Sequence, residues 1–130
     1  MRTRFVGSLT LVIAIAFVAG CAKNEAEVSG TVLMDGVPLK EGDIIFEAAD
    51  GQTTPAATKI AEGKYLLKMI PGEKKVLITA SRPTKIPDPV MGDAAREPLI
   101  GEEFNIKTKL TADIKRGKQT GVNFEVTSLP

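Results

Sequence analysis

The chain has 130 residues, which suits one globular domain and leaves little room for two. Lys and Arg total 17 and Asp and Glu total 16, and this near-neutral balance argues against a nucleic-acid-binding protein. The sequence has no His and one Cys, which excludes Ser-His-Asp or Cys-His catalysis and zinc sites built from these residues. We therefore expect no cofactor, no metal site and no enzymatic activity.

The first 20 residues have the layout of a secretory signal peptide. Arg2 and Arg4 are followed by an uncharged, mostly aliphatic run from Phe5 to Ala22. This run of 18 residues is also near the lower limit for a bilayer-spanning helix, so an uncleaved N-terminal anchor is the alternative.

The end of this segment favours a lipoprotein. Val18, Ala19, Gly20 and Cys21 resemble a bacterial lipobox, which consists of an aliphatic residue, two small residues and a cysteine. The resemblance implies cleavage before Cys21 and attachment of fatty acyl chains, palmitate among them, to this residue. Ala22 is not the Asp that resembles an inner-membrane retention signal, so an envelope location in the outer membrane is weakly favoured over the inner membrane. We expect residues 1–20 to be the signal peptide and 21–26 the lipidated N-terminus and tether.

The remaining residues, 27–130, show the period-two alternation of half-buried strands. In the first strand Val28, Gly30, Val32 and Met34 share one face. Turn residues such as Asp35-Gly36 separate the segments. The predicted strands are 28–34, 43–49, 56–61, 65–69, 76–80, 110–115 and 122–126. Seven short strands without a helical period predict an all-β, seven-stranded, antiparallel, Ig-like β-sandwich.

The order of short motifs resembles the transthyretin-like (prealbumin-like), carboxypeptidase-regulatory-like domain of bacterial lipoproteins. The motifs are Val28-Ser29-Gly30-Thr31-Val32, Asp35-Gly36-Val37-Pro38-Leu39, Gly63-Lys64-Tyr65, Ile70-Pro71-Gly72, Val76-Leu77-Ile78-Thr79-Ala80, Phe104-Asn105, Thr108-Lys109-Leu110, Gly117 and Val122-Asn123-Phe124. The resemblance implies a fold and an envelope location but no specific activity. Lys74 departs from the pattern, because such domains usually carry an aromatic residue soon after the Pro-Gly turn.

Other polar groups have ordinary structural interpretations. Glu102 and Glu103 are adjacent and would point to opposite faces of a strand, which is poor geometry for paired acid–base chemistry. Asp88 and Asp93 flank a loop that lacks the dense oxygen ligands of a calcium site. A basic C-terminal third is expected to be a solvated face, with weak attraction to anionic lipid or polysaccharide as the alternative; its members are Lys107, Lys109, Lys115, Arg116 and Lys118.

The segment from Arg82 to Gly101 is the strongest candidate for a functional site. It contains 20 residues, four of them Pro, and such long loops without secondary structure are usually functional or disordered. Its members Ile86, Val90, Met91, Arg96 and Leu99 form the predicted partner-binding loop, expected to pack along the sandwich. The alternative is a crossover that only covers an open sheet edge.

These features predict a membrane-anchored envelope lipoprotein, held by acyl chains on Cys21, whose β-sandwich is a non-catalytic binding or structural module. Its partner would be an envelope protein or a surface polymer. The alternative function is a carbohydrate- or polysaccharide-binding module of the cell envelope. Exposure of Tyr65 and Phe104 on one face would favour that alternative, and their burial would remove it.

Overall fold

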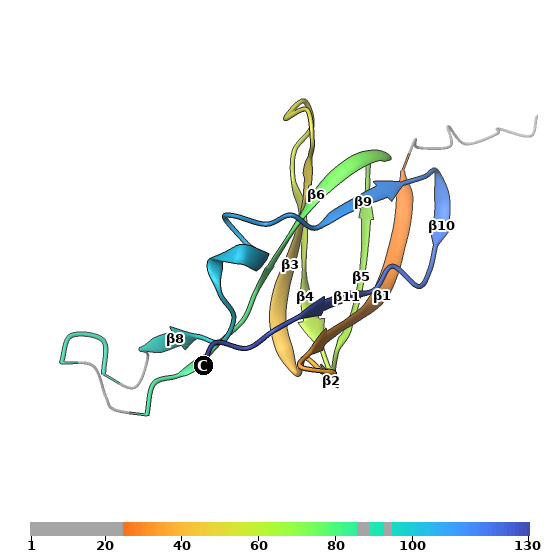
Figure 1. Cartoon of the computed structure of the whole chain (residues 1–130). Helices are drawn as coiled ribbons and strands as arrows, with labels where there is room; N and C mark the ends of the chain where they lie inside the picture. Colours follow the sequence, from red (N-terminus) through yellow and green to blue (C-terminus); the bar gives the residue numbers. More distant parts are fainter. Residues whose placement is uncertain (1–24, 86–88, 93–94) are drawn as a thin grey trace, which may run out of the picture.

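The computed structural model describes residues 25–85, 89–92 and 95–130, and these residues form an all-β domain (Figure 1). The strands are β1 (Ala26–Met34), β2 (Val37–Pro38), β3 (Glu41–Ala48), β4 (Ala56–Ala61), β5 (Lys64–Met69), β6 (Gly72–Thr79), β7 (Ser81–Pro83), β8 (Arg96–Pro98), β9 (Thr111–Ile114), β10 (Gly117–Gln119) and β11 (Phe124–Val126). One 3-10 helix, η1, spans Glu102–Phe104. Each of the seven predicted strand segments contains a strand, which confirms the all-β prediction.

The main sheet is curled, so that its two halves face each other across the core. Its strand order is β10-β1-β5-β4-β3-β6-β9, with β2 and β11 also paired to β1. β4 and β5 pair only at Ala61 and Lys64, next to their turn, so the sheet bends at this hairpin. At the other side a two-residue turn, Lys115–Arg116, joins β9 to β10. This arrangement is consistent with a β-sandwich.

The prediction of a purely antiparallel sandwich of seven strands was wrong in two respects. The described residues contain four further short strands, and β10 and β11 both run parallel to β1. Val28 faces Gln119 and Val32 faces Phe124. Between these two pairings, the C-terminal segment therefore contains one residue more than β1. β10 and β11 therefore form one interrupted strand with a bulge over residues 120–123, the bulge segment.

The bulge segment is bonded tightly to β1 and β5. The hydroxyl of Tyr65 donates to the carbonyl oxygen of Val122 at 2.5 Å, and the Val122 amide donates to the Ser29 carbonyl at 3.1 Å. The amide of Thr31 donates to Oδ1 of Asn123 at 2.9 Å. Gly30 lies directly beneath this segment, and a Cβ there would be 1.8 Å from the Val122 oxygen. The glycine is thus required by the close approach of two backbones.

The core forms where alternating residues of both halves meet. Val28 and Val32 of β1, Ile44 and Phe46 of β3, and Tyr65 of β5 are all less than 5% exposed. The ring of Phe46 lies 6.0 Å from that of Tyr65 and 6.2 Å from that of Phe124, measured between centroids, so aromatic contacts cross the sandwich. The predicted inward faces of these strands are confirmed.

Two polar residues are also buried. Thr108 donates its hydroxyl hydrogen to the Val76 carbonyl at 2.7 Å and accepts from the Leu110 amide at 3.1 Å, which fixes the entry to β9. Lys74 on β6 is only 3% exposed, and its Nζ donates to Thr53 Oγ1 at 3.5 Å. Lys74 is in phase with Val76 and Ile78, so it occupies an inward position of the strand.

Candidate functional site

The predicted binding loop contains a two-stranded ribbon, β7–β8, which we call the ribbon. Ser81 pairs with Pro98, Arg82 with Glu97 and Pro83 with Arg96. The ribbon projects from the sandwich at lower left, whereas β1 begins at the opposite end of the domain (Figure 1). The expectations of a loop without secondary structure and of packing along the sandwich were therefore wrong. The cross-strand pairing within the ribbon satisfies backbone groups that a single extended chain would have to bond to the sheet.

The predicted loop residues are spread over different parts of this projection. Val90 and Met91 lie beyond the paired strands and are 92% and 62% exposed. Arg96 lies on β8, and Leu99 is half-buried against the core at the base of the ribbon. Ile86 lies outside the described residues.

The base of the ribbon is fixed to the domain by backbone bonds and buried side chains. The Leu99 amide donates to the Ala80 carbonyl at 2.8 Å, and the Leu129 amide donates to the Leu99 carbonyl at 2.8 Å. Ala80 and Ile100, which bracket the ribbon in sequence, are 6% and 2% exposed. We call this base, residues 80–81 and 96–100, the root. Because backbone bonds and buried side chains fix it to the domain, it is the part best suited to carry a site.

Side-chain bonds hold the paired strands together across the ribbon. The guanidinium of Arg82 forms an ion pair with the carboxylate of Glu97. Arg96 donates from Nε to Ser81 Oγ at 2.9 Å and from Nη2 to the Ser81 carbonyl at 2.8 Å. Both bonds use uncharged acceptors, so Arg96 keeps a positive charge at the root that no described carboxylate pairs with.

An apolar groove of about 410 Å³ lies on one side of the root, between the ribbon and the β1–β2 turn. Met34, Val37, Pro38 and Leu39 form one wall, and Pro83 and Leu99 contribute to the other. Val37 is 63% exposed, so the groove is open to solvent along this wall. We call it the apolar groove; the segment Val37–Leu39 was not among the predicted site residues. The sequence signal that could have revealed this wall is the aliphatic residue and the proline that directly follow the Asp35-Gly36 turn.

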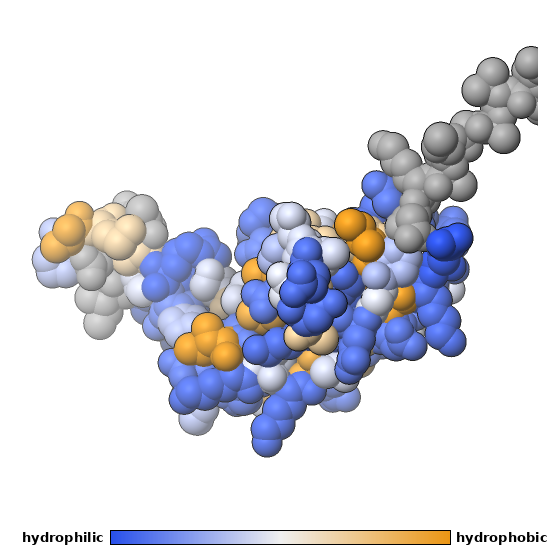
Figure 2. Space-filling view, turned by 90° about the horizontal axis from the view of Figure 1, so that it is seen from above, coloured by the Kyte–Doolittle hydropathy of each residue, from blue (hydrophilic) through white to orange (hydrophobic). Residues whose placement is uncertain are grey.

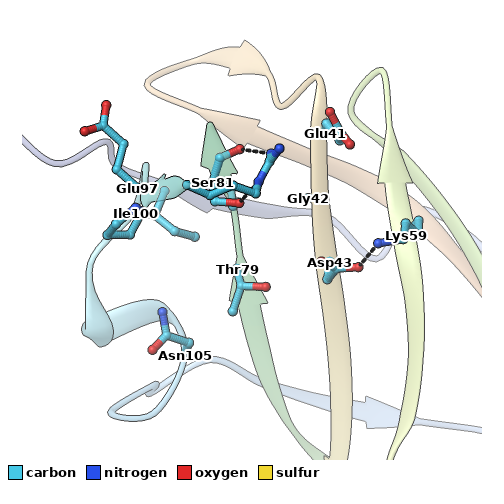
Figure 3. A pocket seen from close by; sticks show the side chains of 12 residues that line it. Glu41, Gly42, Asp43, Lys59, Thr79, Ser81, Glu97, Ile100 and Asn105 are labelled. Carbon is cyan, nitrogen blue, oxygen red and sulfur yellow. Dashed lines mark hydrogen bonds and ion pairs between the residues drawn. The ribbon is translucent and has the colours of Figure 1, made fainter. Parts of the chain in front are cut away.

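A polar pocket of about 370 Å³ lies on the other side of the root (Figure 3). Glu41, Ser81 and Arg96 line both cavities, so the root separates an apolar space from a polar one. In the polar pocket the ammonium of Lys59 lies 3.0 Å from Oδ1 of Asp43. Further polar lining comes from Thr79, Glu97 and Asn105. Such a pocket can bind hydroxyl or amide groups through hydrogen bonds.

The aromatic criterion for a carbohydrate-binding module is not met. Tyr65 is 4% exposed, and burial raises the pKa of its hydroxyl above the usual range. Phe104 is partly buried against the core. Among the residues that the structure describes, no aromatic ring forms an exposed platform on which a sugar could stack.

The remaining sequence candidates that the structure describes lie on the surface. Glu102 and Glu103 are exposed in η1, and Glu102 is paired with Lys107 at 3.0 Å. Lys118 lies 3.7 Å from Glu27, so part of the basic C-terminal third is neutralised by its neighbours. Asp88, Asp93 and the lipobox with Cys21 lie outside the described residues. Figure 2 shows that hydrophobic residues form small separate areas on the face in view, with hydrophilic residues between them.

Over the described ranges, no three or more His, Cys, Asp or Glu side chains are grouped so as to hold a metal ion. The same part of the chain contains no helix that is long and apolar enough to cross a bilayer. Comparisons of the chain with protein-family models and with curated proteins found no match.

Proposed function

We propose that this protein is a lipid-anchored envelope lipoprotein whose transthyretin-like β-sandwich is a non-catalytic binding module. The hydrophobic N-terminal segment that ends in Val18-Ala19-Gly20-Cys21 supports export and lipidation. The curled all-β sheet, with aromatic contacts across its core, supports the sandwich type. Ala22 is not the Asp that resembles an inner-membrane retention signal, and this weakly favours the outer membrane as the location of the acyl chains.

The observation that carries the binding role is the root of the ribbon. It is bonded to the domain through Ala80 and Leu129, and it lies at the end of the domain away from the start of β1 (Figure 1). It has a cavity on each side, and Figure 3 shows the polar one. In a lipidated chain, residues 22–25 separate the acylated Cys21 from β1, so the Cα atoms of Cys21 and Ala26 can lie at most about 18 Å apart. The start of β1 would then lie near the bilayer, and the root would face the aqueous compartment.

The non-catalytic character rests on the side chains that are present. The chain has no His to activate a nucleophile, and two of the three carboxylates in the polar pocket are paired with cations. Polysaccharide binding is the second candidate, and it is supported by the polar lining of this pocket rather than by aromatic stacking.

Lipidation is tested by labelling cells with an alkyne-modified palmitate and separating membrane from soluble fractions. The wild-type chain and the neighbouring control Ala22→Ser should carry the label and remain in the membrane fraction. Cys21→Ala should carry no label. Label on Cys21→Ala, or none on the wild type, would reject the lipoprotein assignment.

Binding is tested by capturing interactors from solubilised envelopes with the full chain. A specific interactor should be lost with Val37→Asp, which places a charge on the wall of the apolar groove. It should be retained with Leu66→Asp, a matched change at a 58% exposed position on β5. Equal capture by both variants would exclude the apolar groove as the binding site.

A further inference from the structure

The apolar groove combines its hydrophobic walls with an excess of positive charge. The charged side chains lining it are three cations and Glu41; the cations are Lys40, Arg82 and Arg96. Glu97 is paired with Arg82, but no described carboxylate lies within ion-pair distance of Lys40 or Arg96. Lys40 and Arg96 therefore border a hydrophobic surface without an ion-pair partner, and Glu41 offsets one of them, which leaves an excess of one positive charge. Such a surface selects a partner that is both apolar and acidic.

The shape of the groove points to an extended polypeptide rather than to a single acyl chain. A lipid tail needs a cavity that encloses most of its surface, whereas Val37 on the groove wall is 63% exposed. The walls come from two short strands, β2 and β7. A segment lying between them would cover these walls with alternate side chains and direct the others toward the cationic rim.

We infer that the apolar groove binds an extended segment of another protein in which apolar residues alternate with Asp or Glu. This inference rests on the proposed binding role of the root and specifies its partner class. Val37 and Leu99 contact the apolar side chains, and Lys40 and Arg96 contact the carboxylates. The partner lies in the aqueous compartment, on the side of the domain away from the start of β1 (Figure 1).

The test uses the full chain in lipid nanodiscs and three fluorescein-labelled ten-residue peptides. The first alternates valine and glutamate, the second alternates valine and lysine, and the third alternates serine and glutamate. Fluorescence anisotropy should show the first peptide binding roughly tenfold or more tightly than either of the others, because each of them lacks one of the two required features. Its affinity should fall when salt is raised from about 0.05 M to 0.5 M.

Variants distinguish the groove from the rest of the surface. Lys40→Glu should weaken binding of the valine–glutamate peptide about fivefold and strengthen binding of the valine–lysine peptide. Val37→Asp should weaken binding of the valine–glutamate peptide roughly tenfold or more. The matched controls Lys109→Glu and Leu66→Asp, both at exposed positions outside the groove, should leave all affinities unchanged. Equal binding of the acidic and basic peptides, or no peptide binding, would overturn the inference.

A second measurement separates failure of the partner class from failure of the proposed function. A photoreactive amino acid replaces Val37 in cells, and mass spectrometry identifies what is crosslinked. A crosslink to an acidic, apolar segment of another protein supports the inference. A crosslink to glycan or lipid overturns the partner class but keeps a binding role for the root. No crosslink at this position, together with no peptide binding, rejects both.

Discussion

Replacing Gly30 with alanine tests whether the contact between β1 and the bulge segment is essential to the fold. The added Cβ would be 1.8 Å from the carbonyl oxygen of Val122, 2.5 Å from its carbonyl carbon and 3.0 Å from the Tyr65 hydroxyl oxygen. Ordinary contact begins at 3.4 Å. The bulge segment must therefore move by about 1.5 Å, which is more than packed backbone tolerates without loss of its bonds.

The expected destabilisation follows from the bonds that this movement disrupts. Three hydrogen bonds attach the bulge segment to β1 and β5: Tyr65 to Val122, Val122 to Ser29, and Thr31 to Asn123. Each contributes about 1 kcal/mol, and overpacking adds about 1–3 kcal/mol. We expect the free energy of unfolding to fall by about 4–6 kcal/mol. For a domain of this size the melting temperature would fall by about 15 °C or more.

Urea unfolding followed by circular dichroism measures this effect. Ser29→Ala, at the neighbouring position of β1, keeps the backbone approach and should change the free energy of unfolding by less than about 1 kcal/mol. Tyr65→Phe removes one of the three bonds, so its effect and that of Gly30→Ala should be non-additive by about 1 kcal/mol. A loss below about 1 kcal/mol for Gly30→Ala, or full additivity with Tyr65→Phe, would refute the reasoning.

Three further changes test other parts of the domain. Lys74→Met replaces a buried ammonium that has only a threonine hydroxyl as acceptor, so it should raise the free energy of unfolding by about 1–2 kcal/mol. Urea unfolding measures this change, and Lys75→Met at an exposed position should have little effect. A loss of stability in Lys74→Met would contradict the reasoning. Thr108→Val should cost about 1–2 kcal/mol through its two lost bonds and Thr108→Ser clearly less, and equal losses would argue against a role for the hydroxyl. Hydrogen bonds from the side chain and amide of Ser128 lower the pKa of Asp35. The stabilisation that the ionised carboxylate contributes is therefore complete above about pH 4, and it is lost as the pH falls through the lowered pKa. The protection factor of the Ser128 amide, which corrects its exchange rate for the intrinsic pH dependence, should therefore fall in acid in the wild type. In Asp35→Asn it should be low at both ends of the pH range, and identical pH profiles of the protection factor would contradict this.

The strands were predictable because each carries its own alternation. The inward face of a strand can be read from the strand alone, without knowing which strands pair with it. Examples are Val28 and Val32 in β1, and Tyr65 and Leu67 in β5. The same rule could have predicted the burial of Lys74, which is in phase with Val76. Its charge argued against an inward position, but the long aliphatic stem can lie in the core when the ammonium reaches an acceptor near the surface.

Strand pairing was not predictable by this route, because the period of a strand does not identify its neighbour. The parallel pairing of β10 and β11 with β1 joins residues about 90 positions apart. The ribbon was missed for a different reason. Its strands carry Arg82 and Pro83 opposite Arg96 and Glu97, so they show no apolar alternation. They are stabilised by cross-strand pairing, by the Arg82–Glu97 ion pair and by the bonds of Arg96 to Ser81.

The predicted site residues that the structure describes divide between the root and the outer part of the projection, and this division has a functional consequence. Arg96 and Leu99 belong to the root, where Ile100 is 2% exposed and backbone bonds continue into the domain. Val90 and Met91 lie beyond the paired strands. Groups that are already ordered lose less conformational entropy on binding. A contact at the root should therefore contribute more to the binding free energy than a similar contact in the outer part of the projection. Val90→Ser should therefore leave peptide affinity unchanged, whereas Val37→Asp on the wall of the apolar groove should reduce it. The opposite ranking would move the site from the groove to the end of the ribbon.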